Sequence, residues 1–111
     1  MQDGDRPILV YTTLPSPEEA KRVGKALIQA RLAACVNIFP GMFSIYEWKG
    51  NLEQGSEAAM LIKTRAALQE RVLTETRRLH PYETPALLVL ELRGGSEDFC
   101  AWIAAQTRAA D

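Results

Sequence analysis

Strand and helix signals follow one another along this chain in an order that allows few folds. Runs rich in β-branched and aromatic residues predict strands, and apolar residues at helical spacing predict helices. The order is strand, helix, strand, strand, helix, strand, then a short helix, and the first six elements form the split βαβ arrangement of the ferredoxin-like fold. The expected strands are 8–13, 34–39 resuming over 43–48, 52–64 and 86–92, and the expected helices follow Ser16-Pro17, cover 67–79 and follow Ser96.

This fold places helices on one face of a four-stranded antiparallel sheet, yet the strands predict a second apolar face. A sheet with one wet face alternates apolar and polar residues, whereas 58–62 and 87–90 are apolar at every position. The central hairpin is also long, because the thirteen residues of 52–64 span about 43 Å at about 3.3 Å each. The sequence therefore predicts an α+β subunit with a long central hairpin and a short C-terminal helix, which packs its sheet on neighbours in an oligomer.

The composition is that of an ordinary globular protein, and 111 residues suffice for one domain. We expect residues 1–6 to be a disordered tail and 7–111 a single ferredoxin-like domain. The net charge of −1 argues against nucleic-acid or membrane-surface binding driven by bulk charge, and no apolar run approaches the roughly 20 residues that cross a bilayer. Cys35 and Cys100 do not form a disulfide framework, so a reducing cytoplasm is the expected compartment.

The segment His80-Pro81-Tyr82-Glu83-Thr84-Pro85 holds the only histidine of the chain. Two prolines fix this loop, so its polar side chains are expected to be held in place without being packed away. Imidazole binds copper and zinc, a carboxylate can add a ligand, and a thiolate suits Cu(I) and zinc. We therefore predict His80, Glu83 and Cys35 as ligands of a divalent metal, completed by another subunit. The alternatives are a His80 that caps the preceding helix and a Cys35 that is a small buried apolar residue.

A cleft between subunits is the second predicted site. Trp48 and Tyr82 are amphipathic aromatic residues, and Glu57 and Lys63 share one face if their strand is regular. With Lys63 as the cation, these side chains are expected to form the walls of a cleft that holds a small anion. The alternatives are aromatic residues in the core or at an interface, and a structural ion pair between Glu57 and Lys63.

Enzyme chemistry is poorly supported by the sequence. A hydrolase needs a nucleophile, a base and an oxyanion site, and Cys35 and His80 supply the first two only if the fold brings them together. The chain has no Cys-x-x-Cys and no dinucleotide fingerprint. We expect no catalysis and no obligatory cofactor.

Several segments, taken together and in order, resemble the CutA divalent-cation tolerance family. The resemblance runs from about Ile8 to Ile103, and it implies a ferredoxin-like subunit, a tight homotrimer, a link to copper and other divalent cations, and a shape similar to the trimeric PII signalling proteins. Two positions depart from the family pattern, because Ala86 stands where an acidic residue is usual and Cys100 lies outside the pattern. The matching segments are Thr12-Thr13, Glu19, Leu32 to Ile38, Ser44 to Gly50, Leu61 to Thr64, His80 to Glu83, and Trp102.

Two functions of different classes follow from the residues and the resemblance. The first is a homotrimeric copper-binding protein of divalent-cation tolerance without catalytic turnover. The second is a PII-like signalling or scaffold protein that binds a small ligand or a partner between subunits. Whether His80 and Cys35 point into open space or into packed core separates them.

Overall fold

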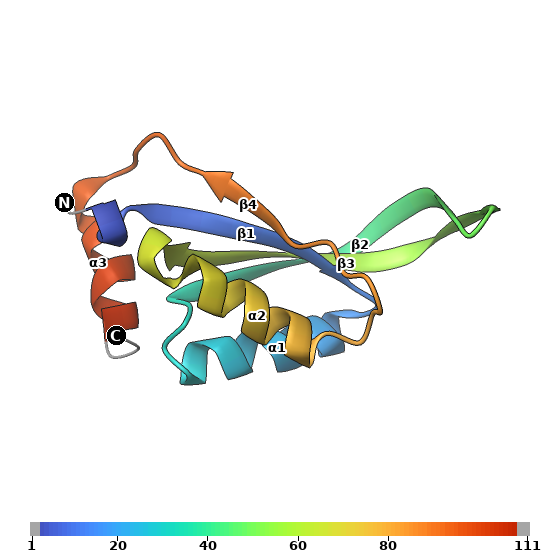
Figure 1. The fold of residues 1–111 in the computed structure, drawn as a ribbon, viewed down its shortest axis with the longest axis horizontal. Coiled ribbons are helices and arrows are strands. Elements are labelled where there is room, and N and C mark those ends of the chain that lie inside the picture. The colour runs from blue at the N-terminus through green and yellow to red at the C-terminus, as the bar shows by residue number, and fades with distance from the viewer. Residues whose placement is uncertain (1–2, 109–111) are drawn as a thin grey trace.

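The computed structural model describes residues 3–108, which form three α-helices, four strands and two short 3-10 helices. The chain runs along the sheet, crosses through a helix, makes a long hairpin, crosses through a second helix and returns to the sheet (Figure 1). The elements are η1 (Asp3–Asp5), β1 (Pro7–Leu14), α1 (Pro17–Gln29), β2 (Cys35–Trp48), β3 (Asn51–Arg65), η2 (Ala66–Leu68), α2 (Gln69–Leu79), β4 (Leu88–Glu91) and α3 (Glu97–Thr107).

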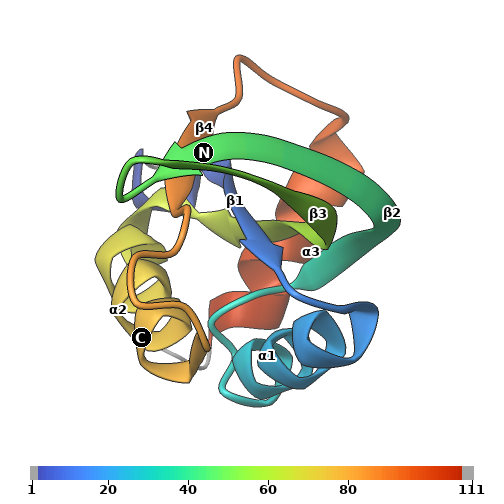
Figure 2. The same ribbon diagram turned by 90° about the vertical axis from the view of Figure 1, so that its right-hand side faces the viewer.

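The four strands form one antiparallel sheet in the order β2-β3-β1-β4. This is the strand order of the ferredoxin-like fold, so the predicted fold is confirmed. Helices α1 and α2 lie side by side beneath the sheet (Figure 2). The side chains between the layers are buried and apolar, and include Val10, Leu14, Ala20, Val23, Leu27, Leu32, Ala58, Met60, Ile62, Leu68 and Val72.

Helix α1 begins as the sequence predicts and then approaches the sheet closely. Ser16 is the N-cap, and its hydroxyl accepts a hydrogen bond from the Glu19 amide at 3.2 Å, with Pro17 in the first turn. A Cβ atom at Gly24 would lie 2.7 Å from Cγ2 of Val36 on β2. Glycine at this position therefore sets the distance between α1 and the sheet.

The hairpin of β2 and β3 extends beyond the helices (Figure 1) and elongates the molecule to 46 × 26 × 22 Å. Its turn consists of Lys49 and Gly50, both with positive φ, which matches the two-residue turn that right-twisted strands favour. The strand expected over 52–64 begins one residue earlier, because Asn51 already pairs with Trp48. Pro40-Gly41 does not divide the strand either, since β2 continues across a register shift between Phe39 and Met42.

The sheet face opposite α1 and α2 exposes apolar side chains, as the doubly apolar strands predict. On that face Phe39 is 51% exposed, Leu88 59% and Leu90 44%. Helix α3 lies at the end of the molecule away from the hairpin (Figure 1), where Lys63 of β3 reaches the Phe99 ring. The last helix thus leaves the middle of this face and the hairpin uncovered.

The ends of the described chain are held together where a disordered tail was expected. Residues 3–5 form η1, so the expectation of disorder over 1–6 does not hold for them, and residues 1–2 and 109–111 lie outside the described residues. Arg65 is only 2% exposed; it donates from Nε to Thr107 Oγ1 at 3.0 Å and pairs with Asp5 at 3.5 Å. Asp5 also contacts Arg108 at 3.3 Å.

Strand β4 and helix α3 differ in detail from the expectation. β4 covers only Leu88–Glu91 of the predicted 86–92, because the residues that follow Pro85 approach the sheet in an irregular conformation. Ser96 is the N-cap residue of α3 but makes no side-chain cap hydrogen bond. Instead, the Asp98 carboxylate accepts from the Phe99 amide at 2.9 Å.

Candidate functional site

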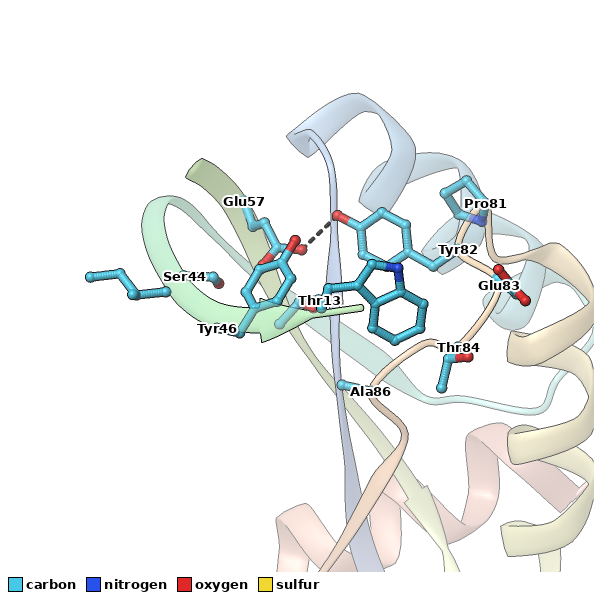
Figure 3. Close-up of a pocket in the computed structure, with 11 residues that line it drawn as sticks. Thr13, Ser44, Tyr46, Glu57, Pro81, Tyr82, Glu83, Thr84 and Ala86 are labelled. Carbon is cyan, nitrogen blue, oxygen red and sulfur yellow. Dashed lines mark hydrogen bonds between the residues drawn. The ribbon is translucent and has the colours of Figure 1, made fainter. Parts of the chain in front are cut away.

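An open groove of about 700 Å³ lies between the base of the hairpin and the loop that follows α2. Three segments bring its walls together: the end of β1, the β2–β3 hairpin and residues 81–86 (Figure 3). Its volume is within the range of about 300–1,000 Å³ that small-molecule sites occupy. The lining residues are Thr13, Ser44, Ile45, Tyr46, Trp48, Glu57, Pro81, Tyr82, Glu83, Thr84 and Ala86.

A hydrogen bond between two of the predicted cleft residues crosses this groove. The Tyr82 hydroxyl donates to Oε2 of Glu57 at 2.5 Å (Figure 3). Burial, the hydrogen bond to Glu57 and the charge of that carboxylate all raise the pKa of Tyr82. Tyr82 therefore keeps its proton and positions the Glu57 carboxylate against the groove.

The loop that carries Tyr82 is fixed at its start by contacts between the two helices. Helix α2 ends at Leu79, and His80 is extended because the next residue is Pro81. The Leu79 carbonyl accepts a hydrogen bond from Arg22 Nη2 of α1 at 2.7 Å, and Arg22 also pairs with Glu19. The guanidinium of Arg22, and not the His80 imidazole, is thus the side chain that satisfies this helix end.

Both ring nitrogens of His80 are engaged in hydrogen bonds, and the residue is only 8% exposed. Nε2 lies 2.8 Å from the Thr13 carbonyl and 3.1 Å from Thr12 Oγ1, and Nδ1 accepts from the Tyr82 amide at 3.1 Å. A carbonyl oxygen only accepts, so Nε2 carries the proton and Nδ1 uses its lone pair. A metal ion would reach this ring only by displacing one of these bonds.

The environment of His80 favours the neutral ring. Burial lowers the pKa of His80; the bond to the Thr13 carbonyl opposes this shift and the Arg22 charge reinforces it. Glu19 and Glu57 act in the opposite direction, with smaller effects. The imidazole thus serves as a neutral link between the groove loop and β1.

The structure separates Cys35 from the other two predicted metal ligands. Cys35 pairs with Lys63 in the sheet, whereas His80 bonds to Thr13, whose partner in β3 is Ala59. These positions are four residues apart along β3, which is about 13 Å at about 3.3 Å per residue. Within residues 3–108, no three His, Cys, Asp or Glu side chains gather in an arrangement that could hold a metal ion.

Lys63, predicted for a cleft between subunits, does not line this groove of one subunit. Its ammonium is 5.1 Å from the centroid of the Phe99 ring, at the α3 end of the sheet. Glu57 and Lys63 share a sheet face as expected, but they are six positions apart along β3, which is about 20 Å. Within residues 3–108 of one subunit, Glu57 and Lys63 do not form the structural ion pair, and Trp48, Glu57 and Tyr82 are the members of the predicted cleft that line the groove. An anion-binding cleft between subunits stays a prediction.

The sequence did not single out several groove residues for this site. Tyr46, Ser44 and Ile45 come from the hairpin, Thr13 from the end of β1, and Thr84 and Ala86 from the irregular approach to β4. Tyr46 carries the one usable signal, an aromatic residue two positions before Trp48 in a strand. Glu83, predicted as a metal ligand, lies here as an exposed carboxylate.

The groove combines carboxylates with aromatic rings, and no basic side chain from the described part of the chain lines it. Glu57 and Glu83 supply the charge, and Tyr46, Trp48 and Tyr82 supply aromatic surface. Such a lining attracts cations and repels anions.

None of the helices within residues 3–108 has the length and apolarity that a bilayer crossing requires.

Comparison with known proteins gives one consistent family. The family model described as CutA1 divalent ion tolerance protein matches residues 8–106. The divalent-cation tolerance protein CutA of Pectobacterium atrosepticum is 44% identical over 108 residues, which cover 94% of this chain and 98% of that protein.

Solved structures agree with this match. The structure of CutA from Xylella fastidiosa has a TM-score of 0.89 at 33% identity and covers 96% of this chain and 99% of its own. The structure titled periplasmic divalent cation tolerance protein CutA, from Archaeoglobus fulgidus, has a TM-score of 0.88 at 39% identity and covers 91% and 98%. The resemblance seen in the sequence is confirmed, and the chain belongs to the CutA1 divalent ion tolerance protein family.

Proposed function

We propose that this protein is a homotrimer that binds divalent cations, copper included, and contributes to divalent-cation tolerance without catalytic turnover. The observation that carries the proposal is the uncovered apolar sheet face, with Phe39, Leu88 and Leu90 exposed in one subunit. Exposed apolar surface of this kind marks an interface. Family membership and the names of the relatives supply the link to divalent cations.

The metal site of this proposal is shared between subunits. One subunit offers an exposed Glu83 and a half-buried Cys35 that lie apart, and a His80 whose two nitrogens are both hydrogen-bonded. A symmetric assembly repeats each ligand and can bring groups from neighbouring subunits within one coordination sphere. Of the predicted set, Glu83 is the ligand that needs no rearrangement.

Copper titration by calorimetry, at neutral pH and with the oligomer confirmed by light scattering, tests the proposal. We expect saturable Cu(II) binding that Glu83→Gln weakens about tenfold, which corresponds to about 1.4 kcal/mol. Glu18→Gln, which removes an exposed carboxylate outside the groove, is the control and should bind as the wild type does. Absence of saturable binding by wild-type oligomer would exclude direct copper binding.

Absence of turnover is supported by the separation of Cys35 and His80, the thiol and imidazole that could act as nucleophile and base. Cys35 lies about 13 Å along the sheet from the position of His80, so a nucleophile and base acting at one reacting atom is not formed by them. We also propose that the protein works in a reducing compartment such as the cytoplasm, since Cys35 and Cys100 are free thiols. A fractionation experiment with an antibody to the native chain tests the compartment.

A second candidate function, a PII-like binder of a small ligand, is favoured by the groove itself. The groove is larger than a metal ion needs, and it lies where the hairpin meets the His80 loop. Ligand occupancy there would couple the hairpin to the subunit body, which is the property a signalling or scaffold protein requires.

A further inference from the structure

The geometry points to a small organic cation that carries an alkylammonium group as the ligand of the groove. This inference deepens the second candidate function and rests on it, because it names the chemical class of molecule that the groove takes. The three observations that carry it are the charge of the lining, the aromatic walls and the volume.

The charge of the lining is negative and is held at a fixed position. Glu57 uses Oε2 to accept the Tyr82 hydroxyl, so its second oxygen, Oε1, is left for another donor. Glu83 adds an exposed carboxylate from the opposite wall (Figure 3). No Lys, Arg or His side chain lines the groove within residues 3–108, so an anion would meet repulsion without compensation.

The aromatic walls favour an organic cation over a hydrated metal ion. Tyr46, Trp48 and Tyr82 line the groove, and indole and phenol faces attract ammonium groups through the ring quadrupole. The Trp48 face already attracts a cation within this chain, because Lys49 Nζ lies 5.7 Å from its centroid. Lys49 is exposed and does not line the groove, so its ammonium can return to water and leave the Trp48 ring to a ligand.

The remaining lining suits the alkyl part of such a ligand. Ile45, Pro81 and Ala86 contribute apolar surface, and about 700 Å³ accommodates several carbon atoms beside the charged group. A divalent metal needs more oxygen or nitrogen ligands than the two carboxylates provide, and the described residues hold no cluster of three metal-ligating groups.

The test is an NMR titration that follows the two indole N–H signals of the full-length protein at constant ionic strength. Trp48 lines the groove, whereas Trp102 of α3 stacks on Phe99 at the other end of the molecule and serves as the internal reference. The probes are n-butylammonium, neutral n-butanol and anionic butyrate. We expect n-butylammonium to shift the Trp48 signal saturably and to bind at least about tenfold more tightly than the other two, consistent with a cation–π contact plus one charge pair.

Two variants locate the binding. Glu57→Gln should weaken n-butylammonium binding about tenfold, as loss of one charge pair predicts. Trp48→Leu removes the reporting indole, so its affinity is measured by calorimetry, and it should fall about fivefold, as loss of one ring contact predicts. Glu47→Gln is the control: it removes a carboxylate of β2, next to Trp48, that does not line the groove, and it should leave the affinity unchanged. Retained circular dichroism in each variant separates lost binding from lost folding.

The outcomes distinguish this inference from the function on which it rests. Equal or tighter binding of n-butanol or butyrate at Trp48 would overturn the cation assignment and leave the groove a ligand site. No saturable Trp48 shift with any of the three probes would overturn both. A blocked lysine peptide that binds as tightly as n-butylammonium would assign the same chemistry to a side chain of a partner protein.

Discussion

At the scale of single residues, the structure gives His80 a different role from the one its chemistry suggests. Its neutral ring bonds to Thr13 through Nε2 and to the Tyr82 amide through Nδ1, and so ties the groove loop to β1. Protonation of Nδ1 would put two donors face to face at Tyr82. The histidine of this chain is therefore a link whose strength depends on pH.

The pH dependence has a definite sign. Burial lowers the pKa of His80 in the folded protein below its ordinary value of 6.5, so the unfolded chain binds more protons as the pH falls through about 6.5. Stability is therefore full above that range and decreases below it. Urea unfolding at pH 7.5, 6.5 and 5.5 should show a smaller free energy of unfolding at each step down.

The comparison variant is His80→Gln, which removes the only imidazole of the chain. We expect lower stability than wild type at pH 7.5, because the links to Thr13 and Tyr82 are weakened, and a flatter dependence on pH. The same slope in both proteins would show that His80 does not carry the effect.

At the scale of elements, α3 is fastened to β3 by a buried charge. Arg65 reaches Thr107 through Nε, and Thr107 Oγ1 also lies 3.0 Å from the Ile103 carbonyl. Thr107→Val removes the acceptor and leaves a buried guanidinium nitrogen without that partner. We expect a loss of about 1–2 kcal/mol in the free energy of unfolding, measured by denaturant titration.

The matched control for that substitution lies in α2. Thr76 is fully buried, and its hydroxyl has no hydrogen-bond partner within residues 3–108. Thr76→Val makes the same chemical change with no bond lost, so we expect unchanged or slightly increased stability. Equal destabilisation by both variants would mean that the Arg65 contact contributes nothing specific.

At the scale of the whole molecule, one face of the sheet is left without a covering layer. Helices α1 and α2 cover one sheet face, while Leu88, Leu90 and Phe39 remain exposed on the other and the hairpin projects from the body (Figures 1 and 2). If a second layer of protein buried this surface, the assembly would gain about 25 cal/mol of free energy for each Å² of apolar area removed from water. The proposed trimer supplies that layer from its own neighbours.

Leu88→Asp tests this account of assembly. A charge on the exposed face costs little in one subunit but opposes burial against a neighbour. The particle mass measured by light scattering should therefore fall from about three times the subunit mass toward the mass of one subunit. Ala101→Asp, on the exposed side of α3, should leave the mass unchanged. An intact oligomer in Leu88→Asp, with native circular dichroism, would place the interface elsewhere.

The sequence by itself determined the element order, the cap of α1 and the second apolar face, because each depends on local spacing or on residues within one turn. The ferredoxin-like fold followed from the element order, and the family from the resemblance of segments such as Leu32 to Ile38 and His80 to Glu83. It also marked Trp48, Glu57 and Tyr82 as cleft residues and Glu83 as a metal ligand, and all four line the groove. Trp48, Tyr82 and Glu83 stay accessible because they lie next to a turn or a proline.

Only the tertiary structure decided what these residues do. Whether a histidine has a free nitrogen depends on Thr13, a residue far away in the chain, and whether Lys63 reaches a carboxylate depends on strand register and on the position of α3. Tyr46 and Ala86 join the groove because a hairpin and a loop meet in space. Contacts between distant segments are fixed by packing, and local sequence does not encode them.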